Sequence, residues 1–332
     1  MKFCGILSRR LSKRREPAPL LALVKCSHSH PCSISRPRDI PAFTRDCSLA
    51  KMQPPTQLHL SFELDDRGLT ILRVKTQQPP WRVVRGFDAP SGERLAHVHN
   101  VSGGVLDTDA LEWRVDVAPR AQAQLTSTGA TRVYRSRSRD RVATQRAEVR
   151  LGEDAYFEYL PDQLIPFAGS RFEQSARIDL ARGASLIWWD IIAPGRDASG
   201  ELFGYESLLS SFEVSAFGEP VATERWNLVP ENRPLDSVAR LGPYRYFASC
   251  YVCRAGEGAS YWRVLENELQ ILADRSASAD VSWGITSLRK HGLLIRGVAM
   301  SGRSLSEGLV EFWRAAKWFL CGRVATLPRK VH

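Results

Sequence analysis

A short pattern that recurs four times constrains what this 332-residue chain can fold into. In each copy an apolar strand is followed by a tight corner and then by a second strand. The first strands of the four copies contain Val117, Leu151, Leu180 and Val214 at equivalent positions, at intervals of 34, 29 and 34 residues. One such unit cannot bury both of its faces, whereas units stacked in register bury them against one another.

The repeat predicts a mainly β fold of stacked, mostly antiparallel strand pairs that is β-helix-like. Because the period is loose, a plain β-sandwich is the alternative. One hairpin is expected at Leu58–Leu64 and Leu69–Val74, on either side of an Asp-Asp-Arg-Gly turn. Another hairpin is expected at Val281–Ser287 and Leu293–Val298.

Two α-helices are expected near the C-terminus. Residues Ser260–Ala273 and Ser304–Leu320 place apolar side chains at helical spacing. The second helix opens with a capping box at Ser304–Glu307, which would satisfy its first free amides. Trp313 and Trp318 widen its apolar face, so we expect them either to belong to the core or to mark a surface where a partner docks.

The positive charge of the chain is concentrated in residues 1–51. Of the 46 Lys/Arg and 36 Asp/Glu, this segment holds 11 and 3, which leaves 35 and 33 for the rest. We interpret residues 1–51 as a disordered or mis-assigned extension, or a targeting signal, ahead of one β domain at residues 52–332. A nucleic-acid-binding domain would carry basic charge on its folded face. The nearly neutral body therefore predicts no nucleic-acid partner.

Several motifs have a functional and a plain interpretation. Cys26–Cys32 offers four metal ligands in seven residues, or is an unstructured tail. Cys250 and Cys253 would point to opposite faces of a strand, which disfavours a shared metal. Arg135–Arg141 is a phosphate- or RNA-binding loop, or a solvated one.

No apolar run approaches the roughly 18–20 residues of a membrane span. Phosphate-loop, dinucleotide-binding, nucleophile-elbow and HExxH motifs are also missing from the sequence. The seven cysteines are too few and too scattered for a disulfide scaffold. We therefore expect a cytoplasmic protein without a membrane segment.

Acidic residues provide the remaining chemistry. The stretch Ala155–Phe172 has the pattern of a buried corner, with a strand followed by turn residues. Acids fall within it and at other predicted strand ends: Asp107, Asp109, Glu158, Asp162, Asp190 and Glu201. Such residues serve as turn residues and caps, as paired carboxylates of a glycosidase, or as transient ligands of a divalent cation.

Five segments in order give the body a family resemblance. From about Leu58 to Lys330 the chain resembles the UreD (UreH) family of urease accessory proteins. Thr108 and Thr128 depart from the family pattern, which has glycine and glutamine there. The matching segments are Ser102–Asp109, Leu125–Ser136, Glu158–Phe167, Trp189–Glu201 and Pro328–Lys330.

The resemblance implies a non-enzymatic maturation factor without a tightly bound cofactor. Such proteins bind apo-urease together with a helical accessory protein (UreF type) and a GTPase (UreG type), and help to pass nickel into urease. If the nickel travels inside this subunit, the resemblance makes Asp109, Glu158, Asp162 and Asp190 candidates for lining the passage. The alternative is a β-helical carbohydrate-active enzyme that uses paired carboxylates.

Overall fold

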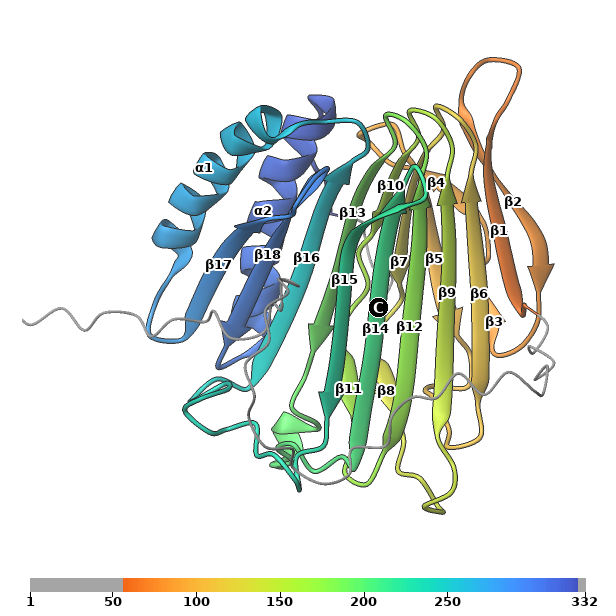
Figure 1. Ribbon diagram of the computed structural model, residues 1–332. Helices are drawn as coiled ribbons and strands as arrows, with labels where there is room; N and C mark the ends of the chain where they lie inside the picture. The colour runs from red at the N-terminus through yellow and green to blue at the C-terminus, as the bar shows by residue number, and fades with distance from the viewer. Residues whose placement is uncertain (1–55, 328–332) are drawn as a thin grey trace, which may run out of the picture. The chain divides into compact units, whose positions relative to one another are not determined.

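The computed structural model describes residues 56–327, which form two β-sheets and two α-helices (Figure 1). The interpretations of residues 1–51, of Cys26–Cys32 and of Pro328–Lys330 lie outside the described residues. The mainly β fold with two helices near the C-terminus is confirmed.

The first sheet has seven strands within the described residues. In spatial order they are β15 (Glu219–Leu228), β14 (Ser207–Ala216), β12 (Arg171–Leu180), β9 (Ala143–Leu151), β6 (Ala110–Val117), β1 (Leu58–Leu64) and β2 (Thr70–Gln77).

The second sheet has eleven strands in the same part of the chain. Its main order is β17 (Val281–Ser287), β18 (Gly292–Ala299), β16 (Tyr246–Arg254), β13 (Ser185–Ile192), β10 (Tyr156–Tyr159), β7 (Gln122–Ser127), β5 (Arg94–Asn100) and β3 (Trp81–Arg82). Three short strands pair beside this path: β4 (Gly86–Asp88), β8 (Thr131–Val133) and β11 (Leu164–Pro166).

Three corners carry the chain from the first sheet to the second. They join β6 to β7, β9 to β10 and β12 to β13, and each ends in a fully buried alanine: Ala121, Ala155 or Ala184. The corners stack, because the amide of Arg120 donates to Glu153 O and that of Asp154 donates to Arg182 O. The predicted unit of strand, tight corner and second strand is confirmed at these three places.

The predicted antiparallel stacking is wrong for the repeated strands. In the first sheet β1, β6, β9, β12 and β14 pair in parallel, as do β5, β7, β10 and β13 in the second. Each pass crosses to the other sheet before returning, so successive strands of one sheet run in the same direction. Antiparallel pairs lie toward the sheet edges, and the fourth predicted corner is a hairpin between β14 and β15.

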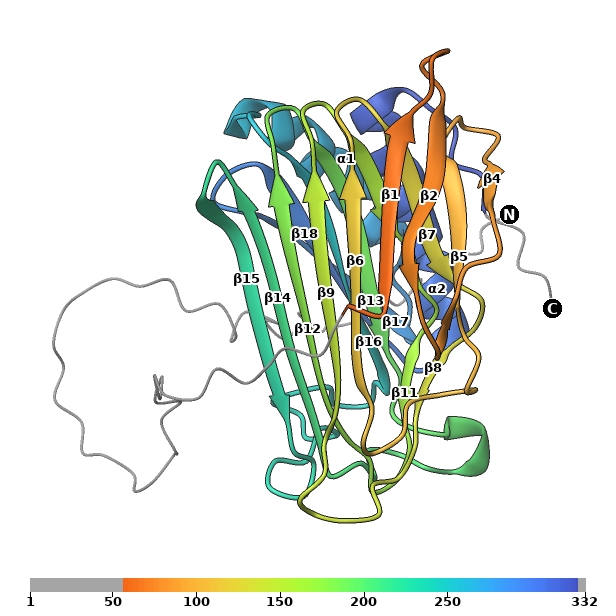
Figure 2. The ribbon, with the colours of Figure 1, turned by 90° about the vertical axis from the view of Figure 1, so that its right-hand side faces the viewer.

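The second sheet is covered on both faces. The first sheet packs on one face of β13 and its neighbours, and the helices lie on the other (Figures 1 and 2). Along β13, Leu186 and Trp188 face the first sheet, whereas Ile187 and Trp189 face the helices. This explains the nearly continuous apolar run, because a strand buried on both faces has no solvent side. On β16 the two cysteines face opposite ways, as predicted.

The two predicted helices are present as α1 (Ala259–Ser276) and α2 (Gly302–Cys321). The predicted capping box is wrong, because α2 begins earlier than expected. Its N-cap is Ser301, whose Oγ accepts a hydrogen bond of 3.1 Å from the amide of Ser304. Glu307 instead pairs with Arg303 on the surface of the helix.

A buried group of charges joins α2 to the second sheet. Lys317 of α2 is fully buried, and its Nζ lies 3.1 Å from one carboxylate oxygen of Glu93 and 3.1 Å from one of Glu158. These contacts are ion pairs without hydrogen-bond alignment. Trp313 Nε1 donates to Glu158 at 3.0 Å, and Arg323 contributes a second cation 3.5 Å from Glu93. The group therefore balances two acids with two bases.

We predict that Lys317→Met destabilises the fold by about 3–5 kcal/mol, because it leaves two buried carboxylates with one cation. The measurement is the free energy of unfolding from denaturant titration. Adding Glu158→Gln to Lys317→Met should restore part of the loss, since the double variant balances the remaining charges.

The matched control is Arg314→Met on the same helix. Arg314 pairs with Glu311 at the surface, where an ion pair contributes less than about 0.5 kcal/mol. If the Lys317 variant costs no more than this control, the buried charges do not hold α2.

Candidate functional site

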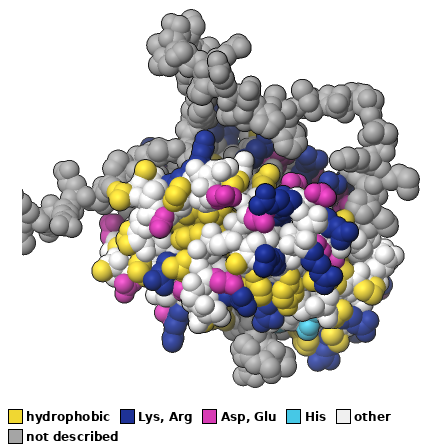
Figure 3. All heavy atoms as spheres, turned by 90° about the horizontal axis from the view of Figure 1, so that it is seen from below, with side chains coloured by type: hydrophobic (Ala, Val, Ile, Leu, Met, Phe, Trp, Pro, Cys, Tyr) yellow, Lys and Arg dark blue, Asp and Glu magenta, His cyan; other side chains and the backbone are white. Residues whose placement is uncertain are grey.

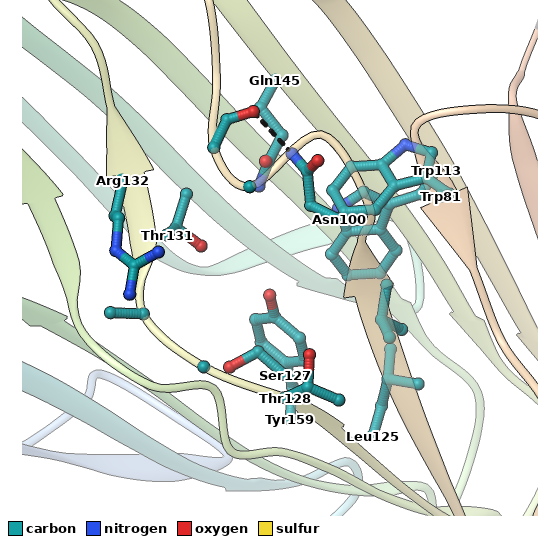
Figure 4. Close-up of a pocket in the computed structure, with 15 residues that line it drawn as sticks. Trp81, Asn100, Trp113, Leu125, Ser127, Thr128, Thr131, Arg132, Gln145 and Tyr159 are labelled. Carbon is teal, nitrogen blue, oxygen red and sulfur yellow. Dashed lines mark hydrogen bonds between the residues drawn. The ribbon is translucent and has the colours of Figure 1, made fainter. Parts of the chain in front are cut away.

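A polar cavity lies between the two sheets and consists of two neighbouring chambers. The wide chamber has a volume of about 280 Å³ (Figure 4). The narrow chamber has a volume of about 40 Å³. Both are lined by Trp113, Thr131, Gln145 and Tyr159, so they adjoin each other.

A row of polar side chains on the first sheet forms one wall of the narrow chamber. Gln145 of β9, Gln174 of β12 and Ser210 of β14 are in register across three parallel strands. Gln174 Nε2 donates to Ser210 Oγ at 3.1 Å. The row lies on the inward face of its strands. Other residues on that face of β12, such as Phe172 and Ile178, belong to the buried core. It supplies amide and hydroxyl oxygens to the interior.

Two aspartates also line the narrow chamber, on the side formed by the second sheet. Asp190 lies in the middle of β13 and accepts a hydrogen bond of 2.9 Å from Trp188 Nε1. Asp162 follows β10, and its amide donates to Ser127 Oγ at 2.8 Å. Asp190 was expected at a strand end, but it is placed inside the sandwich because β13 continues past it to Ile192.

Burial raises the pKa of Asp190 to about 6. The hydrogen bond from Trp188 opposes this shift, and the nearby charge of Glu224 adds to it. An ionised carboxylate is therefore kept inside the protein at a cost in stability near neutral pH. Groups with strongly shifted pKa values are concentrated at functional sites, which makes this aspartate the strongest candidate in the cavity.

The other two candidate carboxylates do not join this pair. Glu158 lies on the helix-facing side of β10, where burial raises its pKa despite the charge of Lys317. Asp109 precedes β6 and accepts a hydrogen bond from the amide of Leu106, which makes it a turn residue. Four acids were predicted to line one passage. The structure brings two of them, Asp162 and Asp190, to one chamber.

The two tryptophans of α2 differ in position. Trp313 is fully buried against Glu158 and Trp189, so the prediction of a docking role is wrong for this residue. Its indole faces the sheet, where Nε1 donates a hydrogen bond to Glu158 of the buried charge group. Trp318 is 58% exposed, and its docking role stays a prediction.

Sequence reasoning missed the polar row. Its signal was the appearance of Gln145, Gln174 and Ser210 at equivalent inward positions of three repeated strands. Aligning the repeats on their corners would have found it, because the other inward positions of these three strands are apolar or small.

The side chains that line the cavity suit a weakly held cation. Carboxylate and amide oxygens bind divalent cations. However, residues 56–327 contain no group of three or more His, Cys, Asp or Glu side chains arranged to hold a metal ion. Helices long and apolar enough to cross a membrane are likewise not found in this part of the chain.

The fold and cavity define a class: a two-sheet β protein of parallel repeated strands with a polar interior and a helical cover. Comparison with known proteins gives the family. Residues 55–332 match the family described as UreD urease accessory protein. The chain therefore belongs to the UreD family.

Individual relatives agree with the family match. The chain is 40% identical over 276 residues to a urease accessory protein UreD from Herpetosiphon aurantiacus, an alignment covering 83% of this chain and 96% of the relative. It is 35% identical to a protein of the same name from Nostoc sp., over 80% of this chain and 91% of that one. A third such protein, from Anaeromyxobacter sp., is 34% identical over 62% of this chain and 67% of its own length.

We predict that Asp190→Asn stabilises the fold by about 1–3 kcal/mol at pH 7.5, with a smaller gain at pH 5. The raised pKa means that the folded state binds a proton more tightly than the unfolded state. Stability is therefore lost as the pH rises from about 4 to about 6, and the full cost is present above that range. Asparagine carries no charge and avoids the cost. Chemical denaturation at the two pH values measures it.

The control is Asp179→Asn. Asp179 lies on β12 and is exposed on the outer face of the first sheet. This variant should show no such dependence on pH. An Asp190→Asn gain that is equal at both pH values would contradict a raised pKa at Asp190.

Proposed function

We propose that this chain is a non-enzymatic scaffold for urease maturation, and that nickel passes through its inter-sheet cavity on the way to urease. In this proposal the chain binds apo-urease together with a helical accessory protein and a GTPase. The family membership supports the maturation role. The observation that carries the passage is the placement of Asp162 and Asp190 in one polar chamber.

The chemistry of the chamber suits passage better than storage. Two carboxylates and a row of neutral oxygens attract a divalent cation, but they lack the imidazole and thiolate ligands that bind nickel tightly. A cation held weakly can leave again, which a carrier requires. The ionisation of Asp190 also makes the affinity dependent on pH, because the carboxyl group is protonated as the pH falls below about 6.

The dimensions of the chamber disfavour the carbohydrate-active alternative. A glycosidase needs two carboxylates on either side of a sugar ring. The space beside Asp162 and Asp190 is about 40 Å³, which is comparable to one or two water molecules. An ion fits there and a sugar ring does not.

The helical layer is the surface that we propose for partner docking. Trp318 on α2 is 58% exposed, and Val264 and Ile271 on α1 are 61% and 53% exposed. Exposed tryptophan is enriched among the residues that dominate protein–protein binding. The covered face of the same helices, by contrast, contributes to the core.

We predict that Asp162→Asn and Asp190→Asn each lower the nickel content of urease by up to about tenfold when the chain is co-expressed with urease and the other accessory proteins. Metal analysis of the purified urease gives the nickel content, and co-purification gives complex formation. Complex formation should be unchanged, since both residues line the chamber between the sheets.

Asp179→Asn is the matched control and should load nickel normally. Unchanged nickel content in both cavity variants would exclude the passage while leaving the scaffold role intact. Turnover of a glycoside by the purified chain would instead favour the enzyme.

We further predict that Trp318→Ala weakens binding to the helical accessory protein or to apo-urease by roughly 30-fold, because truncation of a central interface tryptophan costs about 2 kcal/mol or more. Stability should change by less than about 0.5 kcal/mol, since the side chain is exposed. Pull-down titration measures the affinity. Val238→Ala, at a residue that is 95% exposed in the β15–β16 connection, is the control. Equal binding by both variants would exclude docking through Trp318.

A further inference from the structure

A second polar row lies on the inner face of the second sheet. Asp190 of β13 is directly opposite Ser249 of β16, and Ser249 is directly opposite Arg296 of β18. Residues that are directly opposite in an antiparallel ladder project from the same face of the sheet. Because Asp190 lines the narrow chamber, this second polar row begins at the chamber and runs toward the edge of the sheet at β17.

The polar row of the first sheet leads to the same side of the sandwich. It ends at Ser210 of β14, which is directly opposite Trp226 of β15, the edge strand of that sheet (Figure 1). At β15 the two sheets are in contact. Trp226 packs on Phe247 of β16 with ring centroids 5.1 Å apart, and Tyr251 of β16 donates a hydrogen bond to Glu224 of β15. Polar side chains of both sheets therefore continue from the narrow chamber to the edge at β15.

Ser249 is an unusual residue for its position. It is 3% exposed, and its hydroxyl makes no hydrogen bond to another described residue. The neighbouring inward positions on β16 are the aromatic residues Phe247 and Tyr251. A hydroxyl enclosed without a partner costs roughly 1–3 kcal/mol, whereas alanine would carry no such cost. Packing alone therefore does not explain a serine between Asp190 and Arg296.

The outer end of the second polar row is closed by an ion pair. Arg296 Nη2 pairs with Glu224 Oε1. The side chain of Glu224 is 9% exposed and that of Arg296 is 30% exposed, so the pair lies at the boundary between the interior and the solvent. Tyr251 Oη donates to the other carboxylate oxygen of Glu224 at 2.6 Å. This second bond holds the carboxylate in place independently of the guanidinium.

Glu224 and Asp190 influence each other. Burial is the main cause of the raised pKa of Asp190, and the charge of Glu224 raises it further. Two carboxylates that repel each other across a low-dielectric space are both stabilised by a cation close to them. The hydroxyl oxygen of Ser249, on the strand beside Asp190, is a neutral ligand along the way.

The lower end of the sandwich in Figure 1 is a less favourable route for a cation. The connection between β8 and β9 lies there and carries exposed basic residues together with one exposed acid, Asp140. The basic residues are Arg135, Arg137, Arg139 and Arg141. Figure 3 shows basic side chains across this end of the molecule. Their positive potential opposes a divalent cation, and a route past β15 avoids it.

We propose that Glu224 and Arg296 form a gate at a lateral opening of the narrow chamber, and that a divalent cation held by Asp190 passes Ser249 and reaches Glu224 when Arg296 moves aside. This inference rests on the proposed nickel passage and assigns an opening to it. The cation replaces the guanidinium as the counter-charge of Glu224, so the carboxylate is paired before and after the exchange. The closed gate retains the cation in the narrow chamber, and the open gate releases it at the β15 edge.

The test is stopped-flow fluorescence on the full-length chain, in which nickel-loaded protein is mixed with an excess of EDTA. Nickel quenches tryptophan emission, and Trp188 Nε1 donates a hydrogen bond to Asp190, so the recovery of emission reports release from the narrow chamber. Arg296→Gln should accelerate release by about tenfold or more, because the closing cation is gone while Glu224 remains. Glu224→Gln should slow release by about tenfold, because Arg296 then lacks a counter-charge and repels the nickel ion.

The opposite signs distinguish a gate from a structural ion pair. Both variants break the same pair, so a purely structural role predicts the same effect from both. Arg296→Lys keeps the positive charge and should retain slow release. The matched control is Arg225→Gln on the same strand as Glu224, since Arg225 pairs with Glu213 at the surface and is 73% exposed. It should release nickel at the rate of the unmodified chain.

Changes of the same sign in Arg296→Gln and Glu224→Gln, or rates equal to that of the control, would overturn the gate and leave the passage intact. Failure of the passage has a different signature. Quenching that is as strong and as saturable in Asp190→Asn as in the unmodified chain would place the nickel elsewhere, and would contradict the passage and the gate together.

Discussion

The contact between Lys317 and the two acids Glu93 and Glu158 determines how the helical layer meets the sheets. Each of the three side chains is at most 1% exposed, so none of their charges is solvated by bulk water. Removing one partner from such a group is far more costly than forming it is favourable. The group therefore fixes the position of α2, and with it the outward direction of Trp318.

The second sheet carries acidic side chains on both of its faces. On β10, Glu158 faces α2, whereas the next residue, Tyr159, lines the cavity. On β13, Trp189 packs against Trp313, whereas Asp190 opens into the narrow chamber. The alternation of side chains along a strand produces this division. Acids that are close in sequence consequently have different surroundings: Glu158 contacts Lys317, whereas Asp162 and Asp190 line the narrow chamber.

The sequence predicted those features that local chemistry decides. Alternating apolar residues located the strands and hairpins, and helical spacing located α1 and α2. Parallel pairing was missed because it depends on the chain crossing between sheets. The partner of Glu158 was missed because Trp313 lies 155 residues away. The capping box failed because α2 begins at Gly302, so that Ser301 and not Ser304 is its N-cap.

The central claim is that a cation occupies the space between Asp162 and Asp190. Anomalous diffraction at the nickel absorption edge, on crystals of the full-length chain soaked in a nickel salt, tests it most directly. The account predicts an anomalous peak in the narrow chamber that disappears in Asp190→Asn crystals under the same conditions. Peaks confined to the outer surface of the protein, with none between the sheets, would contradict it.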